Sequence, residues 1–504
     1  MEFVKIKKQK LIQAVRNMHR LFGFFLSLLF FVWCTTGFVM MYKEFPSVSK
    51  TEYLKMRTNI SYDSTIKLSA INEWEYTNLD SCSEIRMYQL LKKKIINIVN
   101  TEGKIICLDA YTGKYVNPIK EHELKDLVNS YFGNTKKVKT IDVITELDQW
   151  IPRTKFLPHM PIYKVLLDDK ENTTCYISSQ SGEIIQKLNF EDKIWAWLGP
   201  IPHWIYFKNL RINTDAWRYV VITLSSLGVV LALLGIILGV SRTVNSKNKS
   251  QKFSPYKKKW FRWHHYVGFI FGLFIFTWIL SGLLSMNPLK WASEDSLSEK
   301  ETKIWQGTNY SILTTVNNFQ SAFDNITKHK SIKEIKFSLF NSDNYLIATN
   351  QNNEVQHVKI QDKNVFNNAI DILSIKSQVL KLLPNNKIIA SEILTDYDNY
   401  YYNKHRTLPL PIYRFKFDDK NSTWYYVNPK TLTVVKKMQT DNKIERWLYN
   451  GLHSLDFPQL FYKRPLWDII VIVLLLGCTL LSFTGLKLTA GWFFRWYNKR
   501  LIRK

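Results

Sequence analysis

Four nearly uninterrupted apolar stretches constrain this chain of 504 residues more than any other feature. They cover residues 19–42, 216–240, 264–286 and 466–486. Each has the roughly 20 apolar residues that a helix needs to cross a hydrocarbon core about 30 Å thick. Helices of soluble proteins seldom stay apolar on every face over such a length. The first stretch is also too long for a cleaved signal peptide, and no small-x-small cleavage site follows it. The sequence therefore predicts a membrane protein with four transmembrane helices.

Basic residues gather beside these stretches on one side of the predicted membrane. Residues 1–42, 241–262 and 466–504 hold 20 Lys and Arg against two acids, whereas the two long segments between the stretches are nearly balanced. This positive-inside pattern predicts that both termini lie in the cytoplasm and that the long segments lie outside. The net charge of +27 does not indicate nucleic-acid binding, because short basic runs beside a membrane supply no folded readout element.

The chain also repeats itself. Residues 17–41 match residues 262–286 at an offset of 245, and residues 157–185 match residues 407–435 at an offset of 250. The coinciding residues include His19 with His264, Trp33 with Trp278, His203 with His453, Trp217 with Trp467 and Gly235 with Gly485. Unrelated apolar segments share Leu and Phe, but not His, Trp and Gly at fixed offsets. We therefore expect a parallel internal duplication, with its pseudo-axis along the membrane normal.

The long segments alternate apolar and polar residues in short runs, for example 104–111, 163–169, 334–340 and 413–419. Such runs between turn residues are typical of half-buried strands in hairpins, and amphipathic stretches at 119–132 and 310–323 indicate helices among them. The expected fold is a four-helix membrane protein with two external α+β domains. The expected organisation is 1–44 N-terminus and first helix, 45–200 first external domain, 201–241 outer ligand segment and second helix, 242–262 basic loop, 263–287 third helix, 288–445 second external domain, and 446–504 outer ligand segment, fourth helix and basic tail.

Four histidines occupy repeat-related positions beside the membrane. His19 and His264 lie at the cytoplasmic ends of the first and third stretches, and His203 and His453 precede the second and fourth on the outside. A single histidine at a helix end is more often an interfacial residue, but residues related by a two-fold pseudo-axis face each other across it. Two imidazoles without a carboxylate or thiolate make a poor zinc site. Haem supplies four ligands itself and needs only two axial ones. The sequence therefore predicts two haem groups per chain, an inner one on His19 and His264 and an outer one on His203 and His453.

Other residues near these histidines have two interpretations each. Haem propionates need cationic partners, and the candidates are Arg16, Arg20 and Arg262 near the inner pair and Arg211, Arg446 and Arg464 near the outer pair. The same arginines fit plain interfacial anchors. Gly23, Gly37, Gly268 and Gly282 either let a flat macrocycle approach the backbone or simply pack helices. Trp33 and Trp278 between the two faces are interpreted as packing residues rather than electron relays. His265 aligns with Arg20 and is less favoured than His264. Five scattered cysteines without a CxxC or CxxCH motif give no support to covalent c-type haem.

Several motifs resemble a known family. MHRLFG at 18–23, WHHYVG at 263–268, YYYNKHRTLPLPIYRFKFDD at 400–419 and WLYNGLHS at 447–454 resemble the PepSY-associated transmembrane proteins, and among these the FoxB-type ferrisiderophore reductases. The resemblance implies a bacterial inner-membrane protein with two periplasmic PepSY-like domains and two b-type haems. It also implies a ferric siderophore or other ferric chelate as electron acceptor. Catalytic residues stay unknown, and the electron donor is quinol or another molecule, because no nucleotide-binding glycine loop is present.

The function expected from these observations is an oxidoreductase that carries electrons outward for iron uptake. One alternative is a non-redox membrane anchor whose PepSY-like domains bind or inhibit periplasmic peptidases. A second is a secondary transporter, which would need ionisable or broken-helix sites near the midplane that the sequence does not show. His159, His405 and the tyrosines at 400–402 either line a substrate cleft or are ordinary surface or core residues.

Overall fold

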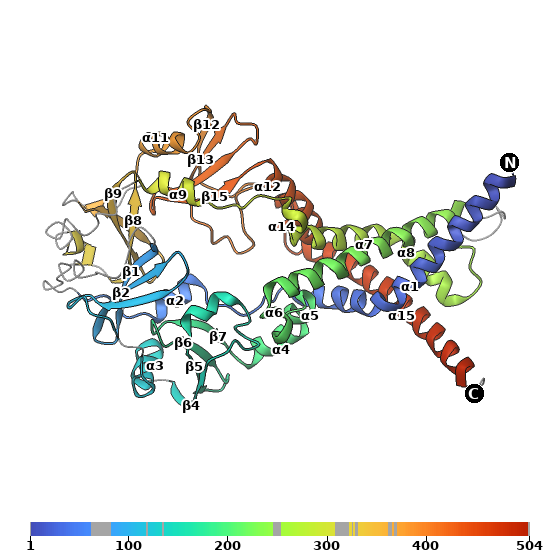
Figure 1. Cartoon of the computed structure of the whole chain (residues 1–504), viewed down its shortest axis with the longest axis horizontal. Coiled ribbons are helices and arrows are strands. Elements are labelled where there is room, and N and C mark those ends of the chain that lie inside the picture. Colours follow the sequence, from blue (N-terminus) through green and yellow to red (C-terminus); the bar gives the residue numbers. More distant parts are fainter. Residues whose placement is uncertain are drawn as a thin grey trace. The chain divides into compact units, whose positions relative to one another are not determined.

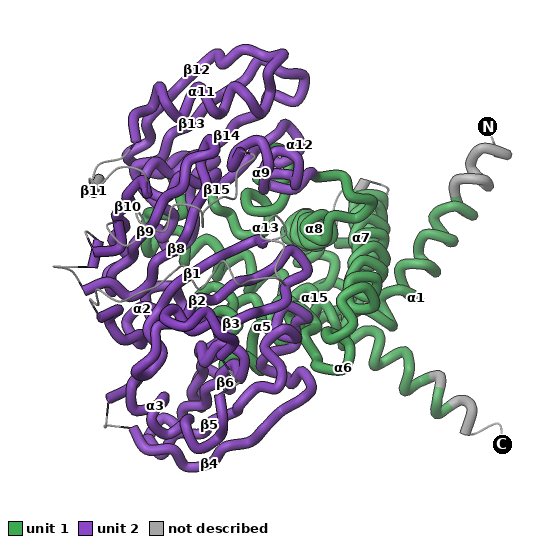
Figure 2. The backbone as a smooth tube through the Cα atoms, turned by 60° about the vertical axis from the view of Figure 1, so that its left-hand side comes forward, with its two compact units in different colours: residues 1–45, 194–292, 443–504 green, residues 46–193, 293–442 purple. Residues whose placement is uncertain are grey.

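The computed structural model describes residues 2–61, 82–116, 119–133, 136–244, 254–307, 322–324, 326–327, 331–360, 365–366 and 370–501. The chain divides into two compact units, which Figure 2 shows in different colours. The helical unit comprises residues 1–45, 194–292 and 443–504, and the β-rich unit comprises residues 46–193 and 293–442.

Four long helices make up most of the helical unit, and each contains all or nearly all of one predicted apolar stretch (Figure 1). They are α1 (Glu2–Met40), α7 (Thr214–Val244), α8 (Lys259–Ser285) and α15 (Leu466–Leu501). Residues 9–40, 214–243, 259–285 and 466–495 of these helices are long and apolar enough to cross a membrane. The prediction of four transmembrane helices is confirmed, so the chain is a membrane protein whose helices contact lipid.

The order of the four helices around the bundle decides which faces meet. Helix α1 packs against α7 and α15, and α8 packs against the same two helices. Helices α1 and α8, which carry the first repeat motif, therefore stand diagonally opposite each other. The core between the helices is built by Leu26, Phe30, Cys34, Leu231, Ile275 and Cys478.

Short helical turns lead into α7 and α15 in the same way. The chain enters α7 through α4 (Phe190–Leu198), α5 (Pro200–Trp204) and α6 (Lys208–Arg211), and it enters α15 through α12 (Thr440–Glu445), the π-helical turn η8 (Arg446–Gly451), α13 (Leu452–Ser454) and α14 (Pro458–Phe461). Trp217 Nε1 donates to the Trp204 carbonyl at 2.8 Å, and Trp467 Nε1 donates to the Ser454 carbonyl at 3.1 Å. The two indoles thus fasten α5 and α13 to the starts of α7 and α15.

The β-rich unit contains two four-stranded antiparallel sheets with the same strand order. One sheet has the order β4 (Lys137–Ile144), β5 (Ile162–Asp168), β6 (Thr174–Ser178), β7 (Ile184–Leu188), and the other has the order β12 (Ile388–Leu394), β13 (Ile412–Phe417), β14 (Trp424–Asn428), β15 (Thr433–Met438). Tyr163 pairs with Ile177 in the first sheet, and Tyr413 pairs with Val427 in the second, so the register is also the same. The runs at 163–169 and 413–419, predicted as strands, correspond to β5 and β13.

Short helices accompany these sheets. They are α2 (Lys50–Met56), η3 (Glu121–Glu123), α3 (Leu124–Phe132) and η5 (Thr154–His159) in the first segment, and α9 (Glu299–Gln306) and α11 (Ile372–Leu382) in the second. Leu124, Leu127 and Val128 of α3 join one apolar core with β5 and β6, and Ile375 and Val379 of α11 join another with β13 and β14. The helix predicted at 119–132 therefore corresponds to η3 and α3. Most of the stretch at 310–323, which was also predicted to be helical, lies outside the described residues.

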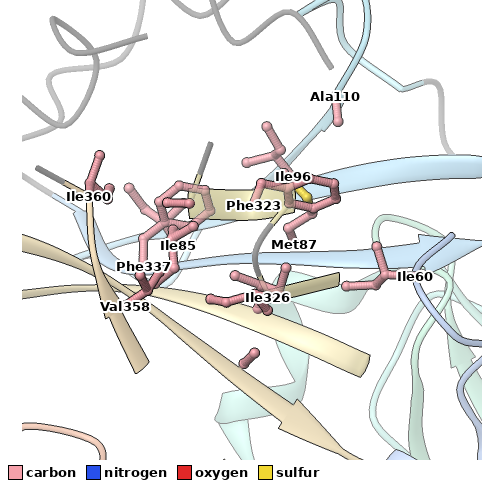
Figure 3. Close-up of a cluster of buried hydrophobic side chains, with 14 of the residues drawn as sticks. Ile60, Ile85, Met87, Ile96, Ala110, Phe323, Ile326, Phe337, Val358 and Ile360 are labelled. Carbon is pink, nitrogen blue, oxygen red and sulfur yellow. The ribbon is translucent and has the colours of Figure 1, made fainter. Parts of the chain in front are cut away.

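A third sheet takes strands from both halves of the chain. Its order is β11 (Val365–Phe366), β10 (Val355–Lys359), β9 (Asp343–Asn350), β8 (Ile332–Phe340), β1 (Cys82–Leu90), β2 (Lys93–Asn100), β3 (Ile105–Asp109). Strands β1 and β8 pair antiparallel, with Met87 opposite Ile335. Phe323 and Ile326 cover this sheet together with Ile60, as Figure 3 shows. The runs 104–111 and 334–340 are confirmed as β3 and β8. The residue boundaries proposed for two separate external domains stay predictions.

Candidate functional site

The helical unit brings the four predicted histidines together in two pairs. His19 on α1 and His264 on α8 have ring centroids 6.4 Å apart, with 47° between the ring planes. His203 on α5 and His453 on α13 have ring centroids 6.3 Å apart, with 75° between the planes. Each pair joins one histidine from either half of the chain. The pairing inferred from the 245- and 250-residue offsets is thus the pairing that the structure has.

The separation within each pair matches two imidazoles on one iron. A metal–imidazole nitrogen bond is about 2 Å long and the nitrogen lies about 1.2 Å from the ring centre, so two axial imidazoles have centroids about 6.4 Å apart. Among the described residues, no group of three or more His, Cys, Asp or Glu could hold a bare metal ion. A macrocycle that brings its own four nitrogens therefore fits the donor set better than zinc does.

Hydrogen bonds fix the orientation and tautomer of the outer pair. His203 Nδ1 lies 2.9 Å from Thr36 Oγ1, and His453 Nδ1 lies 3.0 Å from Ser281 Oγ. Thr36 donates its hydroxyl hydrogen to the Val32 carbonyl at 2.7 Å, and Ser281 donates its own to the Trp278 carbonyl at 2.8 Å. Because each hydroxyl donates its only hydrogen to a carbonyl, it can act only as the acceptor of a hydrogen bond from the imidazole N–H. The proton therefore sits on Nδ1, and Nε2 keeps the lone pair that a metal needs.

Hydrogen bonds at Nδ1 orient the inner pair in the same way. His264 Nδ1 lies 2.9 Å from Thr484 Oγ1, which donates to the Leu481 carbonyl. His19 Nδ1 lies 3.2 Å from the Leu231 carbonyl, which can only accept. Both rings therefore have an acceptor at Nδ1 on a neighbouring helix, α15 or α7. In all four histidines, Nε2 is thus the ring nitrogen whose lone pair stays available to a metal.

Two repeat-related glycines let the backbone approach the inner rings. A Cβ at Gly235 on α7 would stand 3.0 Å from His19 Cε1, and a Cβ at Gly485 on α15 would stand 3.5 Å from His264 Cε1. The flanking helices thus lie close against the space on either side of the pair. Of the glycines singled out from the sequence, Gly282 lies beside the outer pair, where a Cβ would stand 3.6 Å from His453 Cε1. A Cβ at Gly23, Gly37 or Gly268 would instead meet side chains of facing helices. Helix packing is the role that the structure gives these three.

Burial keeps the outer imidazoles neutral. Burial, together with the neighbouring His453, lowers the pKa of His203 to about 3. Burial also lowers the pKa of His453. Neutral imidazole is the ligating form, so proton competition at this site is weak near pH 7.

The six arginines proposed as propionate partners have varied surroundings, and their role stays a prediction. Arg16 and Arg20 are exposed, with Arg20 stacked 5.8 Å from the Trp492 ring, and Arg262 is half-buried. Arg464 pairs with Asp468, and Arg446 is buried and donates to the Asp456 carbonyl. Arg211 is buried over the Trp217 ring at 4.5 Å, and its Nε has no hydrogen-bond partner among the described residues. Arg211 therefore keeps a buried N–H that a carboxylate could accept from.

Apolar and weakly polar side chains fill the space between the pairs. Trp33 stacks on Phe30 with centroids 6.2 Å apart, and its Nε1 is buried without a hydrogen-bond partner among the described residues. The Trp278 carbonyl lies 3.1 Å from His453 Nδ1. The two tryptophans thus pack the bundle, as expected, and at least one also supports an outer histidine through its backbone.

The sequence interpretation missed the hydroxyl groups that orient the rings. Thr36 falls on Ser281 at the offset of 245, so a retained hydroxyl was the signal available. Of the other residues considered, His265 bonds the Gly239 carbonyl away from the inner pair, and Tyr401 is a core residue stacked on Tyr426. His405 is exposed, and His159 lines a cavity in the β-rich unit.

The fold defines a membrane protein with four long apolar helices and a separate β-rich unit. The family model described as the PepSY-associated TM region matches residues 101–335. This part of the chain therefore matches the PepSY-associated transmembrane family, which the motifs of the sequence also resemble. No curated protein matches the chain.

Proposed function

We propose that this protein is a di-haem b oxidoreductase of the bacterial inner membrane that reduces a ferric siderophore or another ferric chelate. One observation carries the proposal. Both repeat-related histidine pairs have the spacing of bis-imidazole ligation, and every Nδ1 has a hydrogen-bond acceptor that leaves Nε2 as ligand. Haem bound between such rings exchanges single electrons without a change of ligands.

The position of the pairs along the helices suits transfer across a membrane. Seventeen residues of α1 separate His19 from Thr36, the residue that holds His203. At 1.5 Å per residue this is about 25 Å, most of the thickness of a hydrocarbon core of about 30 Å. The inner and outer histidine pairs therefore lie about 25 Å apart along α1. The aromatic and aliphatic core between the two pairs excludes water.

The direction follows from charge. The basic segments beside the helices favour cytoplasmic termini, which puts His19 and His264 on the inner side and the β-rich unit in the periplasm. We propose that quinol or another molecule supplies electrons at the inner pair. The acceptor is a ferric chelate in the periplasm, because reduction to ferrous iron weakens binding by hard oxygen ligands. The matching sheets and histidine pairs favour an origin by parallel duplication.

The optical spectrum of the purified protein tests the proposal. We expect a low-spin b-type spectrum with two haems per chain. His264→Ala should remove one haem, whereas His265→Ala, which changes the adjacent histidine, should keep both. The ring planes are 47° apart in the inner pair and 75° apart in the outer pair, so electron paramagnetic resonance should tell which site is lost. A protein that purifies without haem after expression with excess haem would refute the proposal.

Substrate reduction is tested separately. The dithionite-reduced protein should be reoxidised by a ferric hydroxamate chelate and not by the matching gallium chelate, which binds alike but takes up no electron. Haem that stays reduced with every ferric chelate would restrict the proposal to electron transfer to another acceptor. The non-redox peptidase-binding anchor predicts no visible spectrum at all.

A further inference from the structure

A small cavity in the β-rich unit has the chemistry of an anion site. It has a volume of about 260 Å³ and lies where α2, β1, η5 and β7 meet. Its lining consists of Tyr53, Arg86, Lys155, Phe156, His159, Glu183, Ile184 and Ile185. The volume is just below the roughly 300–1,000 Å³ of cavities that hold drug-sized ligands, so it suits a small molecule.

The floor of the cavity is a buried ionic network. Glu183 is 7% exposed and accepts hydrogen bonds from Tyr53, Arg57 and Arg86. Arg57 is also stacked 3.7 Å from the centre of the Tyr88 ring. One carboxylate thus faces two guanidinium groups. Burial alone would raise the pKa of Glu183, but Arg86 and Arg57 outweigh it and hold the pKa at about 2.

Further acids do not reverse the positive balance. Glu334 lies 3.3 Å from Arg86 Nη1, but it also pairs with Lys50 at 2.6 Å. Glu84 lies 3.1 Å from Arg86 Nε and pairs with Lys336 at 2.9 Å. Each acid beside Arg86 is therefore shared with another cation, and the network keeps a surplus of positive charge.

The wall formed by η5 adds two polar groups that the network does not use. Lys155 is exposed and makes no salt bridge with a carboxylate among the described residues. Its ammonium group is nevertheless partly desolvated, and this desolvation, together with the neighbouring Arg153, lowers the pKa of Lys155. His159 Nδ1 is buried and has no hydrogen-bond partner among the described residues. Phe156, Ile184 and Ile185 supply the apolar remainder of the lining.

We propose that this cavity binds a small organic carboxylate. Its carboxylate group is recognised by Lys155 and His159, with Arg86 adding positive charge nearby, and its aliphatic part lies against Phe156, Ile184 and Ile185. Charge-assisted bonds of this kind are the strong ones in anion recognition. The other half of the chain lacks two groups of this site: the residues aligned with His159 and Glu183 are Pro409 and Thr433, whereas Arg86 aligns with Lys336. The site thus belongs to one half alone and is not part of the framework that the two halves share.

The ligand chemistry has two possible sources, a free organic acid or the carboxylate arms of a ferric chelate. Isothermal titration calorimetry on the purified full chain separates them with citrate, ferric citrate and uncharged triethyl citrate as probes. We expect binding of citrate, ferric citrate or both, and no binding of triethyl citrate. Heat from ferric citrate alone assigns the site to chelates, and heat from both assigns it to the carboxylate itself.

Matched variants locate the binding. Lys155→Ala should weaken binding by about tenfold or more, the usual effect of losing a hydrogen bond to a charged group. Lys170→Ala, which removes an exposed lysine from the turn between β5 and β6, should bind like the wild type. His159→Phe should also weaken binding. Wild-type protein that binds neither carboxylate probe, or Lys155→Ala protein that binds like the wild type, would overturn the proposal. Haem binding is measured separately by the optical spectrum. Failure of carboxylate binding would therefore overturn this proposal without bearing on the proposed electron transfer.

Discussion

Replacing the glycine beside His19 tests how tightly the inner pair is positioned. A Cβ at Gly235 would stand 3.0 Å from His19 Cε1, whereas non-bonded carbon atoms prefer about 3.5–4.0 Å. In Gly235→Ala the ring must therefore move by about 0.5–1 Å. That displacement reaches the tolerance of about 0.5 Å within which a functional constellation has to be held. We expect the inner haem to bind more weakly, with a changed low-spin spectrum.

The repeat supplies the matched control. A Cβ at Gly485 would stand 3.5 Å from His264 Cε1, an ordinary contact distance. Gly485→Ala should keep both haems and gain up to about 1 kcal/mol from the better helix propensity of alanine. Haem content per chain, electron paramagnetic resonance and thermal unfolding of both variants are the measurements. Identical behaviour of the two variants would show that close approach does not position the ring, and loss of the outer haem in Gly235→Ala would contradict the assignment.

Three further outcomes follow from hydrogen bonds and charges. Thr36→Val removes the acceptor of His203 Nδ1 and should weaken outer haem binding about 10–100-fold in haem-transfer assays, whereas Thr35→Val, whose hydroxyl bonds only carbonyls of its own helix, should not. Glu183→Gln leaves Arg57 and Arg86 without their buried partner and should lower the free energy of unfolding by about 3–5 kcal/mol in denaturant titrations, with no such loss in the exposed Glu171→Gln. Because the pKa of Glu183 falls from 4.5 to about 2 on folding, its stabilisation should be complete above pH 4.5 and disappear as the pH falls towards 2. A pH profile that is unchanged in Glu183→Gln would contradict this assignment.

Much of the fold could be predicted from local sequence patterns and from the internal repeat. The apolar stretches predicted the four long helices, because length and composition alone decide whether a helix can span a membrane. The repeat offsets predicted which histidines meet, because residues related by a pseudo-axis face each other. The runs at 163–169 and 413–419 predicted strands β5 and β13 from alternation within a few residues. Each of these features is encoded over a short window or by comparison of one half with the other.

Features that depend on distant pairing were not predictable in this way. The pairing of β1 with β8 joins residues about 250 positions apart. A local sequence pattern does not indicate which other strand a given strand will pair with. The acceptors at each Nδ1 come from helices other than the histidine's own, so they depend on bundle geometry. The cavity around Glu183 is lined by residues from four separate elements. The sequence does not indicate that their charged side chains lie close together.

The pairing of β1 with β8 is symmetric about its centre. Ile85 faces Phe337, Arg86 faces Lys336 and Met87 faces Ile335, and residues 85, 86 and 87 correspond to 335, 336 and 337 at an offset of 250. This is the register of an isologous contact, in which two copies of one surface meet around a two-fold axis. A half-length chain would thus carry a self-complementary strand edge and close with a second copy of itself. The covalent link between the halves makes this association intramolecular, so its strength no longer depends on the protein's concentration.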